Sequence, residues 1–516
     1  MKQLLRYLLF LAFLAATIYS VQGVPYNYFT EHEKSPLGET VRFWSGDTLG
    51  GVVRSNDTLC MMQNPVFYDF VITNAPSFCR GPGFNPRFVN YDPVFDAPDL
   101  QYTNLANWTR EQAQAQGRYF ETGTFSRARI VFEDHNLRIT WGVEGAPFDT
   151  TYFNYPLPDS CAVFFECPVQ ISGTVHSTII FGAAGDIDLE DNIIYAGTDT
   201  TTGIIAEDET AKLVLVSDAK IKILNTWSNG RDNQAQGSDI IINALIVALD
   251  SDSGHFTFDQ HNDIWDGYIG PTPDERGQIH LTGALYQKFR GYVHRANNGG
   301  TGYLKDYKYD ERLRYWQLPI FENPDFELSS DVLDFDTVLV DSVYADSIQI
   351  LLQARALIDV PEVTEGVFTI AERLYVFDSL LYIPIKFSPL EIGTFSEELS
   401  VYIEGNRYTI PVQGVSELID NTIDPFILSP FSLILSCYPN PFNPTTTIRF
   451  ELPIASRVAL DIFNTNGQMV ESVINDAYTA GSHAVTFNGS GLPSGLYFAN
   501  LRAGDDLKTI KLLLMK

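Results

Sequence analysis

The stretch Asp239-Ile-Ile-Ile-Asn-Ala-Leu-Ile-Val-Ala-Leu, residues 239–249, is the clearest sign of the fold. Its side chains are almost all apolar and many are β-branched, which predicts a strand covered on both faces. Comparable short runs recur between about residues 43 and 318, with few two-residue hairpin signals between them. They include Gly185-Asp-Ile-Asp-Leu, Ala219-Lys-Ile-Lys-Ile-Leu and Gly277-Gln-Ile-His-Leu. These features favour a parallel β-helix over a β-sandwich.

One segment predicts a helix instead, from Leu105 to Gln116, with Asn107 or Thr109 as its N-cap. The rest indicates strands and turns, so we expect an all-β chain. The expected domains are a parallel β-helix-like domain over residues 24–320, an immunoglobulin-like β-sandwich over 325–415, and a small C-terminal β-sandwich.

The N-terminus has the features of a secretory signal peptide, predicted over residues 1–23. Lys2 and Arg6 flank an apolar run that ends at Ile18, and Val21-Gln22-Gly23 supplies a cleavage site. The run is shorter than the ~20 residues of a membrane span, although an uncleaved anchor is the alternative. Because no later segment predicts a transmembrane helix, we expect none in the mature chain.

The chain has 516 residues and a formal net charge of −30. Residues 437–516 hold six acidic and six basic residues, whereas residues 325–415 hold sixteen acidic and four basic ones. Nucleic-acid binding needs a basic surface, so we expect no nucleic-acid partner. Acidic surfaces mostly serve solubility, and weak Ca²⁺ binding is the alternative interpretation. No other cofactor is indicated.

Five cysteines are present, and export would expose them to an oxidising compartment. The close pairs Cys60/Cys79 and Cys161/Cys167 are therefore the disulfide candidates, and Cys437 is left over. No Cys-x-x-Cys motif occurs, and no His lies at zinc-finger spacing from a Cys pair. A structural zinc site is therefore not expected.

The N-terminal domain resembles an uncharacterised domain of bacterial envelope proteins over roughly residues 40–320. The motifs are Phe43-Trp-Ser-Gly-Asp-Thr-Leu at its start, and Tyr286-Gln-Lys-Phe-Arg-Gly and Gly302-Tyr-Leu-Lys-Asp-Tyr near its end. The resemblance implies a β-helical fold and no established activity.

The next domain, residues 325–415, is similar to the hydin-type immunoglobulin-like domains. Phe387-Ser-Pro and Gly393-Thr-Phe mark the strand–turn–strand near its end, but the usual Asn-x-Gly turn is missing midway. The resemblance implies a spacer or a docking surface. Residues 416–430, with Pro425 and Pro430, predict a linker.

The last module, residues 431–516, resembles the C-terminal sorting domain of the type IX secretion system. Its motifs are Pro439-Asn-Pro-Phe, Asn466-Gly-x-x-Val, Gly481-x-His and Leu492-x-x-Gly-x-Tyr, followed by a terminal lysine. The resemblance implies Sec export, recognition by the outer-membrane translocon, and a location outside the cell or on the outer surface of a two-membrane bacterium. The residues expected to carry recognition are Pro439, Asn440, Pro441, Gly467, Gly481, Gly495, Tyr497, Lys511 and Lys516. Several of these glycines and prolines could equally be turn residues.

No linear motif indicates catalysis or a metal site. The histidines of His255-Phe-Thr-Phe-Asp-Gln-His261 would be ~20 Å apart on a straight strand, too far to share an ion. Asp186-Ile-Asp-Leu-Glu-Asp and Asp250-Ser-Asp-Ser-Gly resemble calcium loops but lack EF-hand spacing. No nucleophile motif or phosphate-binding loop occurs, so we expect no catalytic residue and no metal ligand.

Two classes of function remain open. The favoured one is a secreted or cell-surface-anchored non-catalytic protein with a structural, adhesive or carbohydrate-contacting role, whose partners include surface glycan or envelope components. The alternative is an extracellular polysaccharide-active β-helix enzyme, a lyase or glycoside hydrolase, with carboxylates on separate coils. Aromatic residues crowd the stretch from Tyr286 to Trp316. They could stack on sugars, but we expect them to pack the end of the β-helix.

Overall fold

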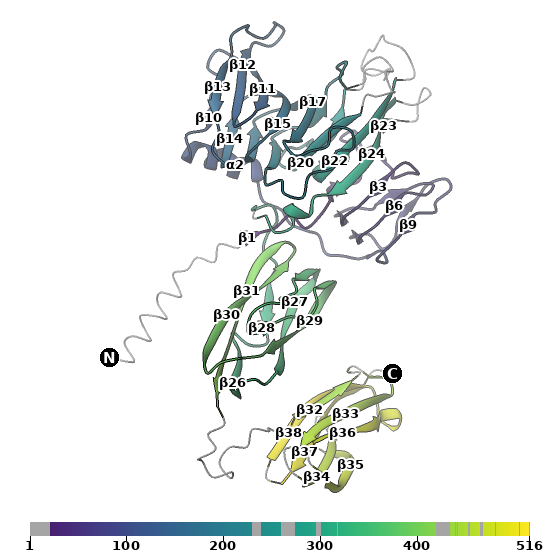
Figure 1. Cartoon of the computed structure of the whole chain (residues 1–516). Coiled ribbons are helices and arrows are strands. Elements are labelled where there is room, and N and C mark those ends of the chain that lie inside the picture. The colour runs from purple at the N-terminus through teal and green to yellow at the C-terminus, as the bar shows by residue number, and fades with distance from the viewer. Residues whose placement is uncertain are drawn as a thin grey trace. The chain divides into compact units, whose positions relative to one another are not determined.

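The chain is almost entirely β-structure in the computed structural model (Figure 1). One α-helix, α2 (Leu105–Ala115), occurs in the described part, so the expectation of an all-β chain is confirmed. No helix there is long and apolar enough to cross a membrane. Most of the predicted signal peptide, residues 1–20, lies outside the described residues. The described residues are 21–229, 239–259, 274–295, 301–316, 318–418, 434–438, 440, 442–452, 455–464, 468–479, 481–504 and 506–514.

The chain divides into two compact units. The first comprises Met1–Leu333, Ser347–Ile385 and Glu398–Pro411, and the second comprises Asp334–Asp346, Lys386–Glu397 and Val412–Lys516. The strands of the large sheet in the first unit, with the short strands β5 and β8, are β2 (Tyr28–His32), β3 (Thr48–Leu49), β4 (Val53–Ser55), β5 (Cys60–Met61), β6 (Val66–Phe67), β7 (Val71–Thr73), β8 (Cys79–Arg80), β9 (Arg87–Phe88), β10 (Tyr119–Phe120), β11 (Arg127–Glu133), β12 (Asn136–Gly142), β13 (Phe153–Pro156), β14 (Ser160–Phe165), β15 (Val169–Val175), β16 (Thr178–Ala183), β17 (Ile187–Tyr195), β18 (Lys212–Ser217), β19 (Ile221–Ile223), β20 (Ile240–Ala248), β21 (Phe256–Phe258), β22 (Asp274–Phe289), β23 (His294–Arg295) and β24 (Thr301–Tyr309).

Parallel ladders connect strands that are not consecutive in the sequence. One ladder runs through β14, β16, β18, β20 and β22, and another through β11, β15, β17, β19 and β21. Parallel pairing of this kind is what the predicted β-helix requires, if each repeat of the ladders is taken as one coil. At one end of this stack, β11 pairs with β12 and β12 with β13 in antiparallel fashion, and β23 also pairs with β24 in antiparallel fashion. We therefore keep the β-helix-like description as an interpretation of these ladders.

The first coils of the sequence join the far end of this stack. β2 pairs in parallel with β22, so that Tyr28 lies opposite Leu285, and β4 then pairs with β2. β3 pairs with β24 in the same way, and β6 and β9 continue beside it (Figure 1). Residues 28–88 are thus first in the sequence but last in the stack.

Strand β20 is the apolar run from which the fold was inferred, and all nine of its residues are buried. Ile242 and Ile246 face the interior of the coils, whereas Leu245 and Val247 pack against a second core that includes Leu105 of α2. Both faces are therefore covered, as the sequence predicted.

Helix α2 begins at the predicted residue, but the predicted N-cap is wrong. The cap is Asn104, whose side-chain oxygen accepts a hydrogen bond from the Asn107 backbone N–H at 2.6 Å. Thr109 lies inside the helix, buried, and donates its hydroxyl to the Leu105 carbonyl at 2.7 Å. Asparagine one residue before the first helical position satisfies an otherwise unpaired N–H, which explains the choice.

The following domain is built on one eight-stranded sheet with the order β1-β31-β30-β27-β29-β28, with β25 paired to β27 and β26 to β31. The immunoglobulin-like sandwich expected here stays a prediction. On β29, Ile383, Ile385 and Phe387 are buried while the residues between them are exposed. Strand β31 continues to Glu417, past the expected domain end at residue 415, and most of the predicted linker lies outside the described residues. The strands are β1 (Val21–Gln22), β25 (Phe326–Leu328), β26 (Leu333–Leu339), β27 (Tyr344–Val360), β28 (Phe368–Thr369), β29 (Leu374–Phe387), β30 (Gly393–Ile403) and β31 (Asn406–Glu417).

The C-terminal module is the small antiparallel sandwich that the sequence predicted. One sheet has the order β32-β33-β36 and the other β35-β34-β37-β38. Val458, Leu460 and Ile462 alternate into the core that the two sheets share. Its strands are β32 (Ile434–Tyr438), β33 (Thr445–Leu452), β34 (Ser456–Asn464), β35 (Met469–Tyr478), β36 (Gly481–Asn488), β37 (Gly495–Ala503) and β38 (Asp506–Leu514).

Candidate functional sites

A row of charged side chains follows the outer face of β17 and β19. Alternation along β17 buries Ile187 and Leu189 and turns Asp188 outward. The Lys222 ammonium lies 3.4 Å from Asp188 and 3.3 Å from Asp259. Burial raises the pKa of the Asp188 carboxyl to about 6, although Lys222 opposes the shift. A carboxyl that titrates near 6 beside a second carboxylate has the properties of a general acid.

The two stretches interpreted as calcium loops have other partners. Asp186 forms an ion pair with Lys220 at 3.5 Å, and Glu190 forms one with Arg129 at 2.9 Å. Asp250 accepts a hydrogen bond from the Ala106 N–H at 2.9 Å, at the start of α2. Asp186, Glu190 and Asp250 therefore have local structural contacts. Weak Ca²⁺ binding stays a prediction.

The histidine pair near β21 does not form a described metal site. His255 lies with its Nδ1 2.5 Å from the Ser253 carbonyl, and His261 is outside the described residues. In the part of the chain that the structure describes, no group of three or more His, Cys, Asp or Glu side chains is arranged to hold a metal ion.

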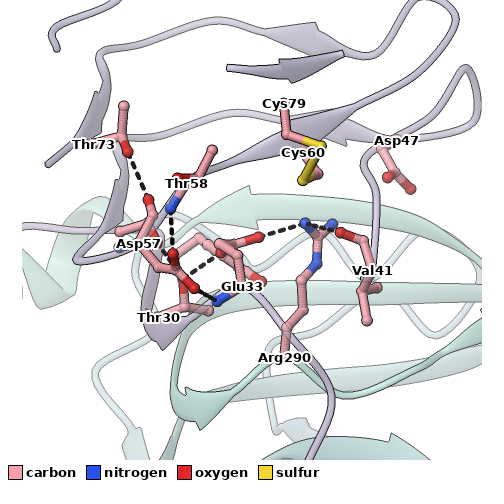
Figure 2. Close-up of polar contacts among 12 residues, drawn as sticks. Thr30, Glu33, Val41, Asp47, Asp57, Thr58, Cys60, Thr73, Cys79 and Arg290 are labelled. Atoms are coloured by element: carbon pink, nitrogen blue, oxygen red, sulfur yellow. Dashed lines mark hydrogen bonds and ion pairs between the residues drawn. A yellow bond between two sulfur atoms is a disulfide. The ribbon is translucent and has the colours of Figure 1, made fainter. Parts of the chain in front are cut away.

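Two buried ion pairs join residues next to β2 and β3 to Arg290, directly after β22, and to Lys305 of β24. Arg290 Nη1 lies 2.6 Å from the Glu33 carboxylate, and both side chains are almost completely buried (Figure 2). The guanidinium lies 3.6 Å from the centre of the Phe43 ring. Lys305 contacts the buried Asp47 carboxylate at 2.9 Å, and burial lowers the pKa of its ammonium despite this partner.

A hydrogen-bond network extends from this ion pair through the coils (Figure 2). Thr30 donates its hydroxyl to Glu33, and the Glu33 N–H donates to Asp57 at 3.0 Å. The Asp57 carbonyl accepts from the Thr73 hydroxyl at 2.6 Å, one coil further on. Thr30, Glu33 and Thr73 are buried and Asp57 is partly buried, and their hydrogen bonds connect neighbouring coils. Arg290 Nη2 is buried without a hydrogen-bond partner.

The predicted disulfide between Cys60 and Cys79 is confirmed. The two residues lie opposite each other in the parallel pair β5–β8 (Figure 2). The predicted pair Cys161–Cys167 is wrong, because both thiols are free and buried. Most of the segment between them is extended in β14, which separates their Cα atoms well beyond the 4.4–6.8 Å of a disulfide.

The aromatic stretch supplies packing. Tyr286, Tyr303 and Tyr307 are buried, and burial raises the phenol pKa of Tyr286 and Tyr307 because it disfavours the charged form. Of the other residues in this stretch, Tyr315 is exposed.

In the C-terminal module, Asn440 attaches the Pro-Asn-Pro-Phe segment to the last strand. Its side-chain Nδ2 donates to the Lys511 carbonyl at 2.8 Å, and its Oδ1 accepts from the Leu513 N–H at 2.8 Å. The Phe442 N–H donates to the Leu513 carbonyl at 2.9 Å, and its ring is buried in the module core. The asparagine side chain thus substitutes for a strand along the free edge of β38.

The other predicted recognition residues are placed as follows. Gly481 begins β36 with φ of +113°, a conformation that favours glycine. Gly495 begins β37, and the buried Tyr497 donates its hydroxyl to the Pro493 carbonyl at 2.8 Å. Lys511 is exposed on β38. Pro439, Pro441, Gly467 and Lys516 lie outside the described residues.

These positions show what sequence reasoning identified and what it missed. The recognition roles of Asn440, Gly481 and Tyr497 stay predictions, and the structure shows the contacts of Asn440 and Tyr497 within the module. Sequence reasoning missed Phe442, although an aromatic residue directly after Pro-Asn-Pro is a signal for a core anchor.

Residues 436–516 match the family model of the secretion system C-terminal sorting domain. No curated protein matches the chain. Among solved structures, similarity is found to a PapD-like domain of human CEP192 (10% identity, 18% of this chain and 87% of that chain, TM-score 0.16). It is also found to the dimeric latent PorU of Porphyromonas gingivalis (13% identity, 37% and 20%, TM-score 0.24). A third is a protein of unknown function from Porphyromonas gingivalis W83 (11% identity, 38% and 100%, TM-score 0.17).

The structural similarities are too low to support an argument about function. The family match covers the whole two-sheet module and includes Asn440, Gly481 and Tyr497. Residues 436–516 are therefore a secretion system C-terminal sorting domain handled by the type IX secretion system, which implies export to the cell surface or the extracellular space.

Proposed function

We propose that residues 24–415 are the cargo of this export route and act outside the cell as a non-catalytic protein with a structural, adhesive or carbohydrate-contacting role. The observation that carries the proposal is the sorting domain at 436–516. That domain has its own hydrophobic core and no net charge, whereas the acidic excess lies upstream. The predicted signal peptide would bring the chain to the periplasm first.

The contacts of the cargo support a scaffold role. Two acids at or directly before β17 have basic partners, since Asp186 pairs with Lys220 and Glu190 with Arg129. Buried ion pairs and a disulfide connect successive coils, which suits a rigid spacer.

The test of export is deletion of residues 437–516. We expect the truncated chain to accumulate in the periplasm, protected from protease added to intact cells, while the full-length chain is digested or found in the medium. We also expect the tail to be removed near residues 416–436 during export, as mass spectrometry of the surface form would show. Undiminished surface delivery of the truncated chain would refute the proposal.

A second candidate function is polysaccharide cleavage, and the cluster of Asp188, Lys222 and Asp259 favours it. The two carboxylates come from separate coils and share one ammonium, and Asp188 titrates near the pH at which a general acid works. The same contacts also suit a structural ion-pair row, which is why we rank this candidate second.

The two candidates separate in one experiment. The mature chain is incubated with a polysaccharide panel, and binding and released reducing or unsaturated sugar are both measured. Sugar release that Asp188→Asn abolishes would establish the enzyme, with Asp186→Asn, directly before the same strand, as the matched control. Binding without release supports the non-catalytic function.

A further inference from the structure

A cavity of about 220 Å³ opens within the first compact unit. Its walls are residues 98–101, 322–325 and 352–356, together with Arg54 of β4 and Glu404 after β30. This volume is below the ~300–1,000 Å³ of pockets for drug-sized ligands, so it suits a molecule the size of one sugar or amino acid.

Arg54 contributes a buried positive charge to this cavity without an ion-pair partner among the described residues. Its side chain is 1% exposed, and its Nη2 donates to the Pro98 carbonyl. Its Nε and Nη1 donate to no protein atom. Burial lowers the pKa of the guanidinium to about 9, with Asp99 raising it and Arg355 lowering it. Arg54 therefore stays charged at neutral pH.

An unpaired buried charge is energetically expensive, and proteins normally pair such groups or use them. The Phe377 ring lies 5.4 Å from the guanidinium carbon and supplies only a weak compensating interaction. Arg54 lines this cavity, and an anionic group bound there would satisfy its unpaired nitrogens once the buried side chain turns toward the cavity.

The rest of the wall limits what kind of anion fits. Glu404 is 4% exposed, its Oε1 accepts from the Leu357 N–H at 3.1 Å, and its Oε2 has no protein partner. Burial raises its pKa to about 8, so it is mostly a neutral carboxylic acid at pH 7. The carboxylates of Asp99 and Asp325 also line the cavity and would repel a multiply charged phosphate. They would accept hydrogen bonds from hydroxyl or ammonium groups.

We propose that this cavity binds a small monocarboxylate that also carries hydroxyl or amino groups, with its carboxylate on Arg54 and its donors toward Asp99 and Asp325. A hexuronic acid and an α-amino acid are two sources of this chemistry. The site goes beyond the proposed surface function and does not depend on it, since it belongs to the folded first unit.

The test is calorimetric titration of the purified mature chain with glucuronate, serine and glucose at pH 7. We expect glucuronate or serine to bind at least tenfold more tightly than glucose, which lacks the carboxylate, and comparison of the first two identifies the source. Arg54→Gln should weaken binding of glucuronate or serine at least tenfold. The exposed control Arg138→Gln should leave their binding unchanged.

Two outcomes would overturn the proposal. In the first, the wild-type chain binds neither glucuronate nor serine, or it binds glucose equally well. This result needs no variant. The other is unchanged carboxylate binding by folded Arg54→Gln. Should Arg54→Gln fail to fold, the same titration is made with Glu404→Gln, a neutral variant of similar shape. The glutamine keeps a hydrogen-bond donor at this wall, so this variant should still prefer glucuronate or serine over glucose. Loss of that preference would also count against the proposal.

Discussion

Replacement of Arg290 by methionine should destabilise the first unit strongly. The change keeps an apolar stem of similar length over Phe43 but leaves the Glu33 carboxylate, 1% exposed, without its cation. Removal of one partner of a buried ion pair costs about 3–5 kcal/mol. The Thr30 hydroxyl still donates to Glu33 in the variant, so we expect the lower end of that range.

The matched control is Arg138→Met, which removes the same kind of charge from a pair with Glu133 at 2.9 Å. Those side chains are 38% and 45% exposed, and an exposed pair contributes about 0–1 kcal/mol. Urea unfolding is followed by tryptophan fluorescence, because Trp44 stacks on His294 near the Arg290 site. A loss for Arg290→Met within 1 kcal/mol of the Arg138→Met loss would refute the reasoning. The double variant Glu33→Leu/Arg290→Met should recover much of the loss, because no unpaired charge remains.

Three further predictions follow from named contacts. Asn440→Leu removes two hydrogen bonds to β38 and should lower the stability of the C-terminal module by about 1–2 kcal/mol, measured by thermal unfolding. Equal stability of the variant and the wild type would contradict the role of Asn440 at the edge of β38. Glu404 has a folded pKa of about 8 against an ordinary 4.5, so its contribution to stability is present below pH 4.5 and is lost as pH rises through 8. Glu404→Gln should therefore flatten the pH dependence of unfolding across that window, and an unchanged slope would count against the shift. Non-reducing mass spectrometry should find the Cys60–Cys79 bridge, which contributes ~3 kcal/mol to stability on the loop-entropy model. The buried thiols of Cys161 and Cys167 should react with an alkylating reagent only after unfolding.

Local patterns in the sequence were sufficient for the strands but not for their partners. The run at 239–249 predicted a strand covered on both faces because almost all of its side chains, on either face of the strand, are apolar. The pairing of β2 with β22 brings together residues more than 250 positions apart, and no local pattern encodes such a contact. The Cys161–Cys167 error has a related cause, because proximity in sequence does not bring residues together along an extended strand.

The candidate sites show the same limit. The C-terminal motifs were recognisable because turns and glycines lie at fixed spacing within one small module. Arg54 and Glu404 could not be identified, since each is an ordinary charged residue in the sequence and becomes unusual only through burial beside one cavity. Asp188 appeared in a presumed calcium loop, and only the parallel register of β17 with β19 places it beside Lys222.

The central claim is that the C-terminal module directs export from the periplasm to the cell exterior, and a fusion protein tests it most directly. A folded reporter carrying residues 1–23 at its N-terminus and residues 418–516 at its C-terminus is expressed in a host with a type IX secretion system. The fraction of reporter accessible to external protease on intact cells is then measured. The account predicts that most of the reporter reaches the surface or the medium, and that a fusion lacking residues 437–516 stays in the periplasm. Equal periplasmic retention of both fusions would contradict it.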